Sequence, residues 1–321
     1  MLYPIAIPAV VGSVVAPSVN IGDMDNNGFD LNIQYRNDAM GGDLIYSVGL
    51  VVSHYKNKIV KLTDIKAESI NGPDLRQMVY SRATIGTAYP EYFGLIVDGI
   101  FQTQAEAAAY APEFGGTYNQ AGHFKFRDIS GPDGVPDGKI DNQDRTYIGS
   151  PHPKFTSGLN IDLSFKGISF STFFYASVGN KLVNVVARWI DYSQFNGDRS
   201  HDALYDAWTP ENTGARLPKF DQDNISQYPS TAFLENGSFL RCKTMQLGYT
   251  LPKTFINKIG MQSVEFYLQA TNLFTMTKYR GLDPEVIDPD FSDSGSGMSL
   301  GQDNGAWPTA RQFMLGLKID Y

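Results

Sequence analysis

The chain has 321 residues, a formal net charge of −8 at pH 7 and a sequence pI near 5.0. This acidic balance, without any basic run, argues against a nucleic-acid partner, because phosphate binding needs clustered Lys and Arg. Cys242 is the only cysteine, so an internal disulfide and a cysteine-based metal site are excluded, while 31 Gly, 17 Pro and 13% aromatic residues favour strands joined by turns.

The opening stretch, residues 1–19, is apolar but does not have the pattern of a signal peptide. Pro4, Pro8 and Pro17 interrupt it, and no positive charge precedes it. No part of the sequence has the roughly 18 to 20 uninterrupted apolar residues that a membrane-spanning helix needs. A helical membrane protein is therefore excluded, and we expect the chain to begin inside a longer protein whose export signal lies upstream.

Alternation of apolar and polar residues predicts a series of antiparallel strands, each with one apolar face. The clearest runs are residues 29–35, 44–52, 159–165, 168–175, 264–271 and 313–321. Lys166 and Gly167 join two of these runs as a two-residue hairpin turn. A further run lies between Phe239 and Leu251, where the alternation changes phase, and a β-bulge near Lys243 would explain the change.

Residues 92–102 and shorter pieces near Phe124 and Tyr147 raise the prediction to about 8 to 10 strands. The turn at Lys166 is minimal, whereas residues 179–235 and 279–308 form very long connections. Outer-membrane barrels combine short periplasmic turns with long extracellular loops. The predicted fold class is therefore all-β, an antiparallel transmembrane β-barrel with long extracellular loops. A soluble β-sandwich shows the same alternation and stays open as the alternative.

Seven short motifs follow one another in a fixed order. They are residues 20–28 (Asn-Ile-Gly-Asp-Met-Asp-Asn-Asn-Gly), 97–102 (Val-Asp-Gly-Ile-Phe-Gln) with 104–107 (Gln-Ala-Glu-Ala), the aspartate-rich 128–149, 208–212 (Trp-Thr-Pro-Glu-Asn), 236–241 (Asn-Gly-Ser-Phe-Leu-Arg), 247–252 (Leu-Gly-Tyr-Thr-Leu-Pro) and 270–274 (Ala-Thr-Asn-Leu-Phe). In this order they resemble the SusC/RagA family of TonB-linked outer-membrane transporters, over essentially the whole chain.

The resemblance matches only the C-terminal third or so of the family. It implies that residues 1–321 are the C-terminal portion of a roughly 22-stranded TonB-dependent receptor barrel. The signal peptide, the TonB box and the plug domain of the family are absent from this sequence.

The function that the resemblance implies is import of glycans, oligosaccharides or peptides across the outer membrane of Gram-negative, Bacteroidetes-type bacteria. Import would be powered by the TonB complex through the missing N-terminal part, with a SusD-like lipoprotein as a lid and outer-membrane lipid around the wall. No enzymatic activity and no required cofactor are expected.

Two other functions compete with this one. A soluble calcium-dependent carbohydrate-binding β-sandwich would use the same alternating strands. A polysaccharide-degrading β enzyme would need paired carboxylates such as Asp283 and Glu285, but acids beside Pro284 are ordinarily a solvated turn.

The aspartate-rich segment resembles a calcium-binding EF-hand loop. Asp133, Asp137 and Asp144 occupy the first, fifth and twelfth positions, and Asp128 lies just upstream. Val135, however, stands at the third position, where an oxygen ligand belongs. These four aspartates are therefore candidate Ca²⁺ ligands, with a solvated Asp/Gly turn as the alternative.

The long connection 179–235 carries large side chains that could contact cargo or a partner protein. They are Arg188, Trp189, Tyr192, Phe195, Tyr205 and Trp208. Flat aromatic faces stack on sugar rings or pack on proteins, and the alternative is that these side chains pack on each other to order the loop. At the other end, Phe313 and the terminal Tyr321 resemble the C-terminal signal by which barrel-assembly machinery recognises its clients.

Overall fold

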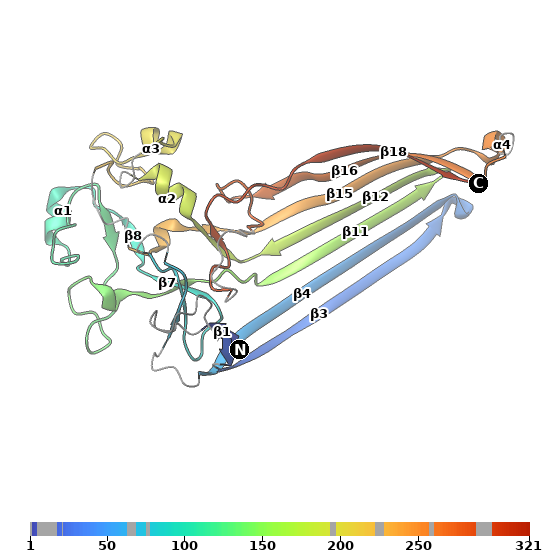
Figure 1. Cartoon of the computed structure of the whole chain (residues 1–321). Coiled ribbons are helices and arrows are strands. Elements are labelled where there is room, and N and C mark those ends of the chain that lie inside the picture. Colours follow the sequence, from blue (N-terminus) through green and yellow to red (C-terminus); the bar gives the residue numbers. More distant parts are fainter. Residues whose placement is uncertain are drawn as a thin grey trace, which may run out of the picture.

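A computed structural model describes the chain except for residues 1, 5–17, 21, 63–68, 75–77, 193–196, 222–227, 257–259 and 287–296. One end of the molecule is a long sheet of seven antiparallel strands, and the other end is a compact group of loops and short elements (Figure 1). The order across the sheet is β18 (Gln312–Asp320), β16 (Ser263–Thr277), β15 (Phe239–Thr250), β12 (Ile168–Val178), β11 (Phe155–Phe165), β4 (Leu44–Leu62) and β3 (Gly22–Ala39).

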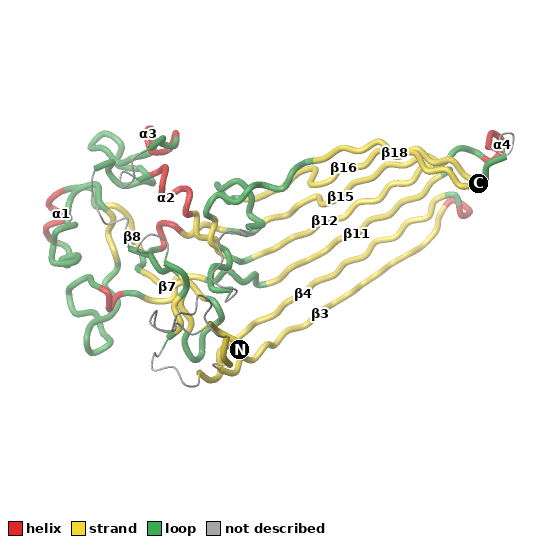
Figure 2. The backbone as a smooth tube through the Cα atoms, in the orientation of Figure 1, coloured by secondary structure: helices red, strands yellow, loops and turns green. Residues whose placement is uncertain are grey.

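This long sheet is open in the described part of the chain. Its first and last strands, β18 and β3, lie at opposite edges and do not pair with each other. Figure 2 shows the seven strands as a single curved layer that extends away from the loops. No helix in the described residues is long and apolar enough to cross a membrane.

The strand register collects the apolar side chains on one face of the sheet. Two rows of cross-strand neighbours on this face are Ile33, Leu50, Leu159, Phe174, Cys242 and Phe274, and Tyr46, Leu163, Phe170, Leu247, Leu268 and Leu315. On the opposite face one row is Arg36, Ser47, Asp162, Ser171, Gln246, Gln269 and Met314. Successive residues of a strand point to opposite faces, so the sheet has one apolar and one largely polar face.

The apolar face is exposed. Leu268 and Leu247 are 52% and 53% exposed although they lie on interior strands of the sheet, and Leu315 on the edge strand is 81% exposed. A sandwich would bury these side chains against a second sheet. The alternative of a soluble sandwich is therefore not supported, and the strand pattern of a membrane-barrel wall is confirmed.

Two local devices fix the register. Lys166 and Gly167 both have positive φ, 46° and 86°, which is the backbone of a tight hairpin turn between β11 and β12. The predicted bulge is also confirmed, since the pairing of β15 with both neighbours shifts between Cys242 and Thr244 and leaves Lys243 outside the ladder. The bulge restores the phase, so that Cys242 and Met245 both lie on the apolar face.

The connections at the two ends of the sheet differ greatly in length. At one end lie the 3-10 turn Met40–Gly42, the Lys166–Gly167 turn and residues 251–262, which include α4 (Lys253–Ile256). At the other end the described parts of residues 63–154, 179–238 and 278–311 fold together, and we call these parts the loop cap (Figure 1). The predicted asymmetry of short turns and long loops is confirmed.

The loop cap contains short strands and helices. They are β5 (Ile70–Asn71), β6 (Ser81–Ala83), β7 (Glu91–Gly94), β8 (Val97–Ile100), α1 (Gln104–Ala109), β9 (Phe124–Phe126), η3 (Asn142–Asp144), β10 (Thr146–Gly149), β13 (Lys181–Asn184), α2 (Val185–Asp191), α3 (His201–Tyr205), η5 (Thr231–Phe233), β14 (Leu234–Asn236) and β17 (Gln302–Asp303). They form the sheets β10-β7-β6-β5, β14-β13-β17 and β8-β9. A separate pair joins β1 (Leu2–Pro4) to β2 (Ser18–Asn20).

The cap corrects the location of three predicted strands. Residues 92–102 form two strands, β7 and β8, in different sheets, and the pieces near Phe124 and Tyr147 are β9 and β10. None of them belongs to the long sheet, which has seven strands in the described residues. Alternation identifies a half-buried strand but does not say which layer buries its face.

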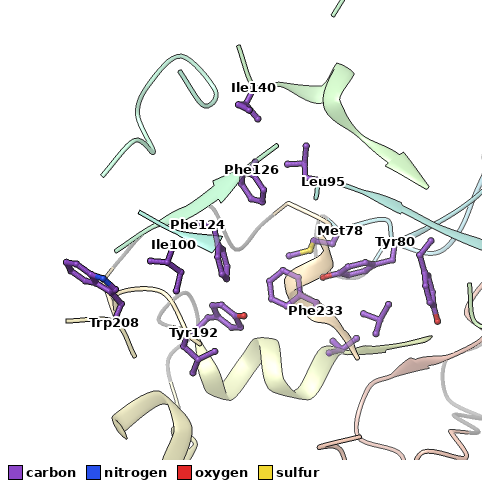
Figure 3. Packing of buried hydrophobic residues seen from close by; sticks show 14 residues of the cluster. Met78, Tyr80, Leu95, Ile100, Phe124, Phe126, Ile140, Tyr192, Trp208 and Phe233 are labelled. Carbon is purple, nitrogen blue, oxygen red and sulfur yellow. The ribbon is translucent and has the colours of Figure 1, made fainter. Parts of the chain in front are cut away.

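The loop cap has a hydrophobic core of its own. Figure 3 shows Phe124, Phe126, Leu95 and Tyr80 from the first long loop beside Phe233 and other side chains from the second. The third loop joins through β17, which pairs with β13, and through Leu300, whose carbonyl oxygen accepts a hydrogen bond from Tyr92 Oη at 3.1 Å. Burying each large side chain contributes about 1.5 to 3 kcal/mol, so the loops stabilise one another.

This core makes a prediction for the stability of the loop cap. Phe126 is fully buried, and Phe126→Ala should destabilise the cap by about 3 to 5 kcal/mol because it removes an aromatic ring and leaves a cavity. Limited proteolysis should then cut the cap at lower temperature. Leu204→Ala is the matched control, since Leu204 is 73% exposed and its loss should change stability by less than about 0.5 kcal/mol. Equal protease sensitivity of both variants would contradict the shared core.

Candidate functional site

Arg280, which follows the end of β16, lines two clefts. One, of about 370 Å³, is lined by residues from all three long loops, including Phe124, Glu235 and Arg280 itself. The other, of about 540 Å³, includes Asp191, Arg280 and Asp303. Both clefts are formed by residues of the loop cap and are lined by charged as well as apolar side chains.

Arg280 connects these clefts through ion pairs. Its Nη2 lies 2.7 Å from Glu235 Oε1, and its Nη1 lies 3.3 Å from Asp191 Oδ2 and 3.2 Å from Asp202 Oδ2. Burial disfavours the charged guanidinium, but the attraction of Glu235 and Asp191 outweighs it and raises the pKa of Arg280. Arg280 therefore stays charged and holds the second and third long loops together. The sequence pattern gave no signal for this cluster, because its members are far apart along the chain.

The candidate contact residues of the second loop fall into buried and exposed groups. Trp208 is buried, and its indole N–H donates to Gln102 Oε1 at 3.0 Å. Tyr192 is buried between the rings of Phe124 and Phe233, with centroid distances of 6.1 and 5.1 Å.

Arg188 is also buried, and Trp189 is half-buried against the cap core. Tyr205, by contrast, is 66% exposed and packs against the His201 ring in a tilted arrangement, with a centroid distance of 4.3 Å. Phe195 lies outside the described residues. Among the described members of the group, Tyr205 is the most exposed and can meet cargo or a partner protein without rearrangement of the loop.

A buried charge cluster ties the third long loop to the polar face of the wall. The guanidinium of Arg241 on β15 pairs with Asp283 and lies 2.7 Å from Glu285 Oε2. Lys243, the bulge residue, lies 2.6 Å from the same Glu285 oxygen. The hydroxyl of Thr309 donates to Asp283 at 2.7 Å. Both ends of the third loop are thus held at one point of β15.

Electrostatics favour the ionised cluster. Burial alone would raise the pKa of Asp283, but hydrogen bonds from Arg241 and Thr309 outweigh it and hold that pKa below its ordinary value. The interpretation of Asp283 as part of a solvated turn is therefore wrong, and Glu285 is half-buried. Neighbouring prolines suggested exposure, whereas two cations more than 40 residues earlier pair with these carboxylates.

The aspartate-rich segment is organised by backbone amides. Asp144 is buried. Its Oδ1 accepts hydrogen bonds from the backbone N–H groups of Ile129 and Ser130, and its Oδ2 accepts one from the backbone N–H of Asp141. Asp128 Oδ2 accepts from the Gly138 N–H at 2.8 Å.

Asp133 and Asp137 lie in the intervening turn, where Asp137 Oδ1 accepts from the Lys139 N–H at 3.0 Å. Across the described residues, no group of three or more His, Cys, Asp or Glu side chains lies close enough to hold a metal ion. Calcium binding by Asp128, Asp133, Asp137 and Asp144 stays a prediction.

Phe313 and Tyr321, the residues that resemble a C-terminal assembly signal, lie at the two ends of the last strand. Such a signal has to be accessible to the assembly machinery. Phe313 is on β18, on the apolar face opposite Ala270, and Tyr321 directly follows that strand. Both side chains are exposed. Their role in barrel assembly stays a prediction.

The Arg241 cluster generates a prediction for the third loop. Arg241→Met should leave Asp283 buried without its cation, at a cost of about 3 to 5 kcal/mol, and should release the loop from β15. Hydrogen exchange in residues 278–286 and 297–311 should then become faster.

Arg216→Met is the control for this experiment. Arg216 pairs with Asp202 and Asp206 on the surface of the cap, where such pairs contribute at most about 1 kcal/mol. If Arg241→Met left exchange in the third loop as slow as Arg216→Met does, the loop would not depend on the buried cluster.

The chain is similar to known proteins in both sequence and fold. No model of a protein family matches the chain. The chain is 31% identical over 329 residues to TonB-dependent receptor P3 of Formosa agariphila, covering 100% of this chain and 31% of that receptor. It is 25% identical over 327 residues to TonB-dependent receptor SusC of Bacteroides thetaiotaomicron, covering 100% of this chain and 29% of SusC.

A solved structure of the RagAB peptide transporter has a similar fold. The TM-score is 0.75 at 23% identity, over 100% of this chain and 32% of the matched chain. The RagAB peptide importer in an open-open state gives a TM-score of 0.72 at 24% identity. The chain spans about a third of the length of the curated relatives that it matches.

Proposed function

Because this chain belongs to the SusC/RagA type of TonB-dependent receptors, we propose that it forms part of the barrel wall and extracellular loops of an outer-membrane importer. The observation that carries the proposal is the exposed apolar face of the seven-stranded sheet, backed by a polar face. A soluble protein would not leave an apolar patch that spans all seven strands exposed to water. Lipid would cover the apolar face, and the polar face would line a water-filled lumen.

The open edges of the sheet fit this role. In lipid every backbone N–H and C=O must find an internal partner, so a spanning sheet has to close. The edges at β3 and β18 would pair with further strands of the same transporter. The short turns would then face the periplasm, and the loop cap would lie outside the cell.

The proposed cargo is an oligosaccharide or a peptide. RagAB is a peptide transporter, which supports peptide cargo by analogy. Both clefts beside Arg280 are lined by charged side chains, and the smaller one also by the rings of Phe124 and Tyr192, which suit either cargo. Energy would come from the TonB complex through a part of the transporter outside this chain.

We further propose that a SusD-like lipoprotein closes over the loop cap and that the protein is not an enzyme. Tyr205 and Leu204 on α3 are exposed and offer an apolar contact for such a lid. Asp283 and Glu285 are engaged by Arg241 and Lys243, so this pair is not available for acid–base catalysis.

The wall proposal is tested by placing one charge on either face of β16. Leu268→Arg, introduced into the complete transporter, should lower its stability in lipid vesicles by about 2 to 4 kcal/mol, because the charge would lie in hydrocarbon. Gln269→Arg is the matched control on the adjacent, polar face, and it should fold as the unchanged protein does. The folded fraction is measured by heat-modified mobility on gels. Equal losses for the two variants would rule out a lipid-facing apolar side.

The lid proposal is tested at α3. Tyr205→Ala should weaken binding of the SusD-like partner by about 2 kcal/mol if the ring is an interface anchor. Phe255→Ala is the control, since Phe255 is also 66% exposed but lies at the short-turn end of the sheet. Affinities are measured with the purified complex in detergent. A lid that binds the Tyr205 variant unchanged would place the interface elsewhere on the cap.

A further inference from the structure

Two arginines share one aromatic ring on the outer face of the sheet β10-β7-β6-β5. The guanidinium carbon of Arg82 on β6 lies 4.4 Å from the ring centroid of Phe93 on β7, and that of Arg145, just before β10, lies 5.4 Å away. The neighbours Ser81 and Tyr92 are buried, so Arg82 and Phe93 point to the face opposite the cap core. We call Arg82, Arg145 and Phe93 the arginine pair site.

The supporting frame of this site is rigid. Tyr147 lies directly opposite Phe93 in the strand ladder and packs edge-on against its ring, with centroids 5.3 Å apart. The Tyr147 hydroxyl is hydrogen-bonded to the Thr84 hydroxyl at 2.7 Å. Tyr147 therefore holds the Phe93 ring in place from the side, and the position of this ring does not depend on the two arginines.

The site carries two positive charges without a counter-charge. In the part of the chain that the structure describes, neither Arg82 nor Arg145 forms an ion pair, and the Nε atom of each is buried without a hydrogen-bond partner. Elsewhere in the cap, Arg127 lies 2.5 Å from Asp98. Two like charges near one ring, each with a buried donor that lacks a partner, are unfavourable unless an anion lies close to them.

The neighbouring ionisable groups do not neutralise the pair. Glu91 stands opposite Arg82 in the ladder, but its carboxylate accepts from the Ala88 N–H at 3.3 Å, and Lys56 is the cation that attracts it. Burial and the nearby charge of Arg82 lower the pKa of Arg145. An anion bound close to both guanidinium groups would reverse this effect.

We propose that the arginine pair site binds an oxyanion, a carboxylate or a sulfate group, carried by the molecule that the transporter imports. Guanidinium groups present planar forks of N–H donors that match such groups with paired hydrogen bonds. Half-buried positions strengthen these bonds relative to open water. That the oxyanion belongs to cargo rests on the proposed import function, whereas binding of the oxyanion itself does not.

The test uses the purified protein in detergent, with no transport step. Saturation-transfer NMR follows binding of glucuronate and of an acetylated aspartyl dipeptide, with glucose as the neutral comparison and sodium sulfate as a competitor. Arg82→Gln and Arg145→Gln should each weaken oxyanion binding by about tenfold or more, as expected for loss of a charge-assisted hydrogen bond. Arg127→Gln is the control, because it removes the same charge from the cap at a paired position.

Whether the site binds an oxyanion and which kind of molecule carries that oxyanion are tested separately. Selective loss in the two site variants, with sulfate competition, supports the site, and the preferred probe tells a sugar acid from an acidic peptide. Absence of any oxyanion binding to the unchanged protein overturns the proposal, as does equal weakening in Arg127→Gln. Thermal unfolding of each variant provides a second readout, since sulfate should raise the unfolding temperature of the unchanged protein more than that of the site variants. A negative result in these binding experiments would not change the outcome of the Leu268→Arg experiment, which tests the proposed barrel wall.

Discussion

The register of the seven long strands is the constraint on which the rest of the molecule depends. A strand that slipped by one residue would turn its entire apolar set to the polar side. The turn at Lys166 and Gly167 fixes one pair of strands, and the bulge at Lys243 fixes the phase of β15 against both neighbours. With the register fixed, every strand contributes to the same apolar surface, and the long loops all leave from the same end.

The bulge does more than correct the phase. It brings Lys243 to the same carboxylate as Arg241, so that Glu285 is held by two cations of one strand. A second contact joins the wall to the loop cap at β4, where Ile59 packs with Ile70, Ala83 and Met298. The loop cap is therefore attached to the wall by a buried charge cluster and by a small apolar cluster, at points contributed by different strands.

The sequence predicted the wall well and the cap poorly, for a physical reason. Alternation with period two reports a local property of each strand, and it correctly located the long strands, the hairpin and the bulge. The cap depends on contacts between distant segments, such as Tyr80 with Phe233 or Arg280 with Asp191, which no local pattern encodes. The same limit explains why Asp283 and Glu285 looked solvated and why the arginine pair site was not found, since its members come from three separate short segments.

The shared core of the cap has a consequence for how such loops can diverge. Phe124 and Phe126 from one connection pack with Tyr192 and Phe233 from another, and the third adds β17 to a strand of the second. A replacement of a single connection by its counterpart from another receptor would cut through this packing. New recognition surfaces are therefore easier to evolve on exposed rims such as α3 than by exchange of whole loops, and the three connections should be inherited as a set.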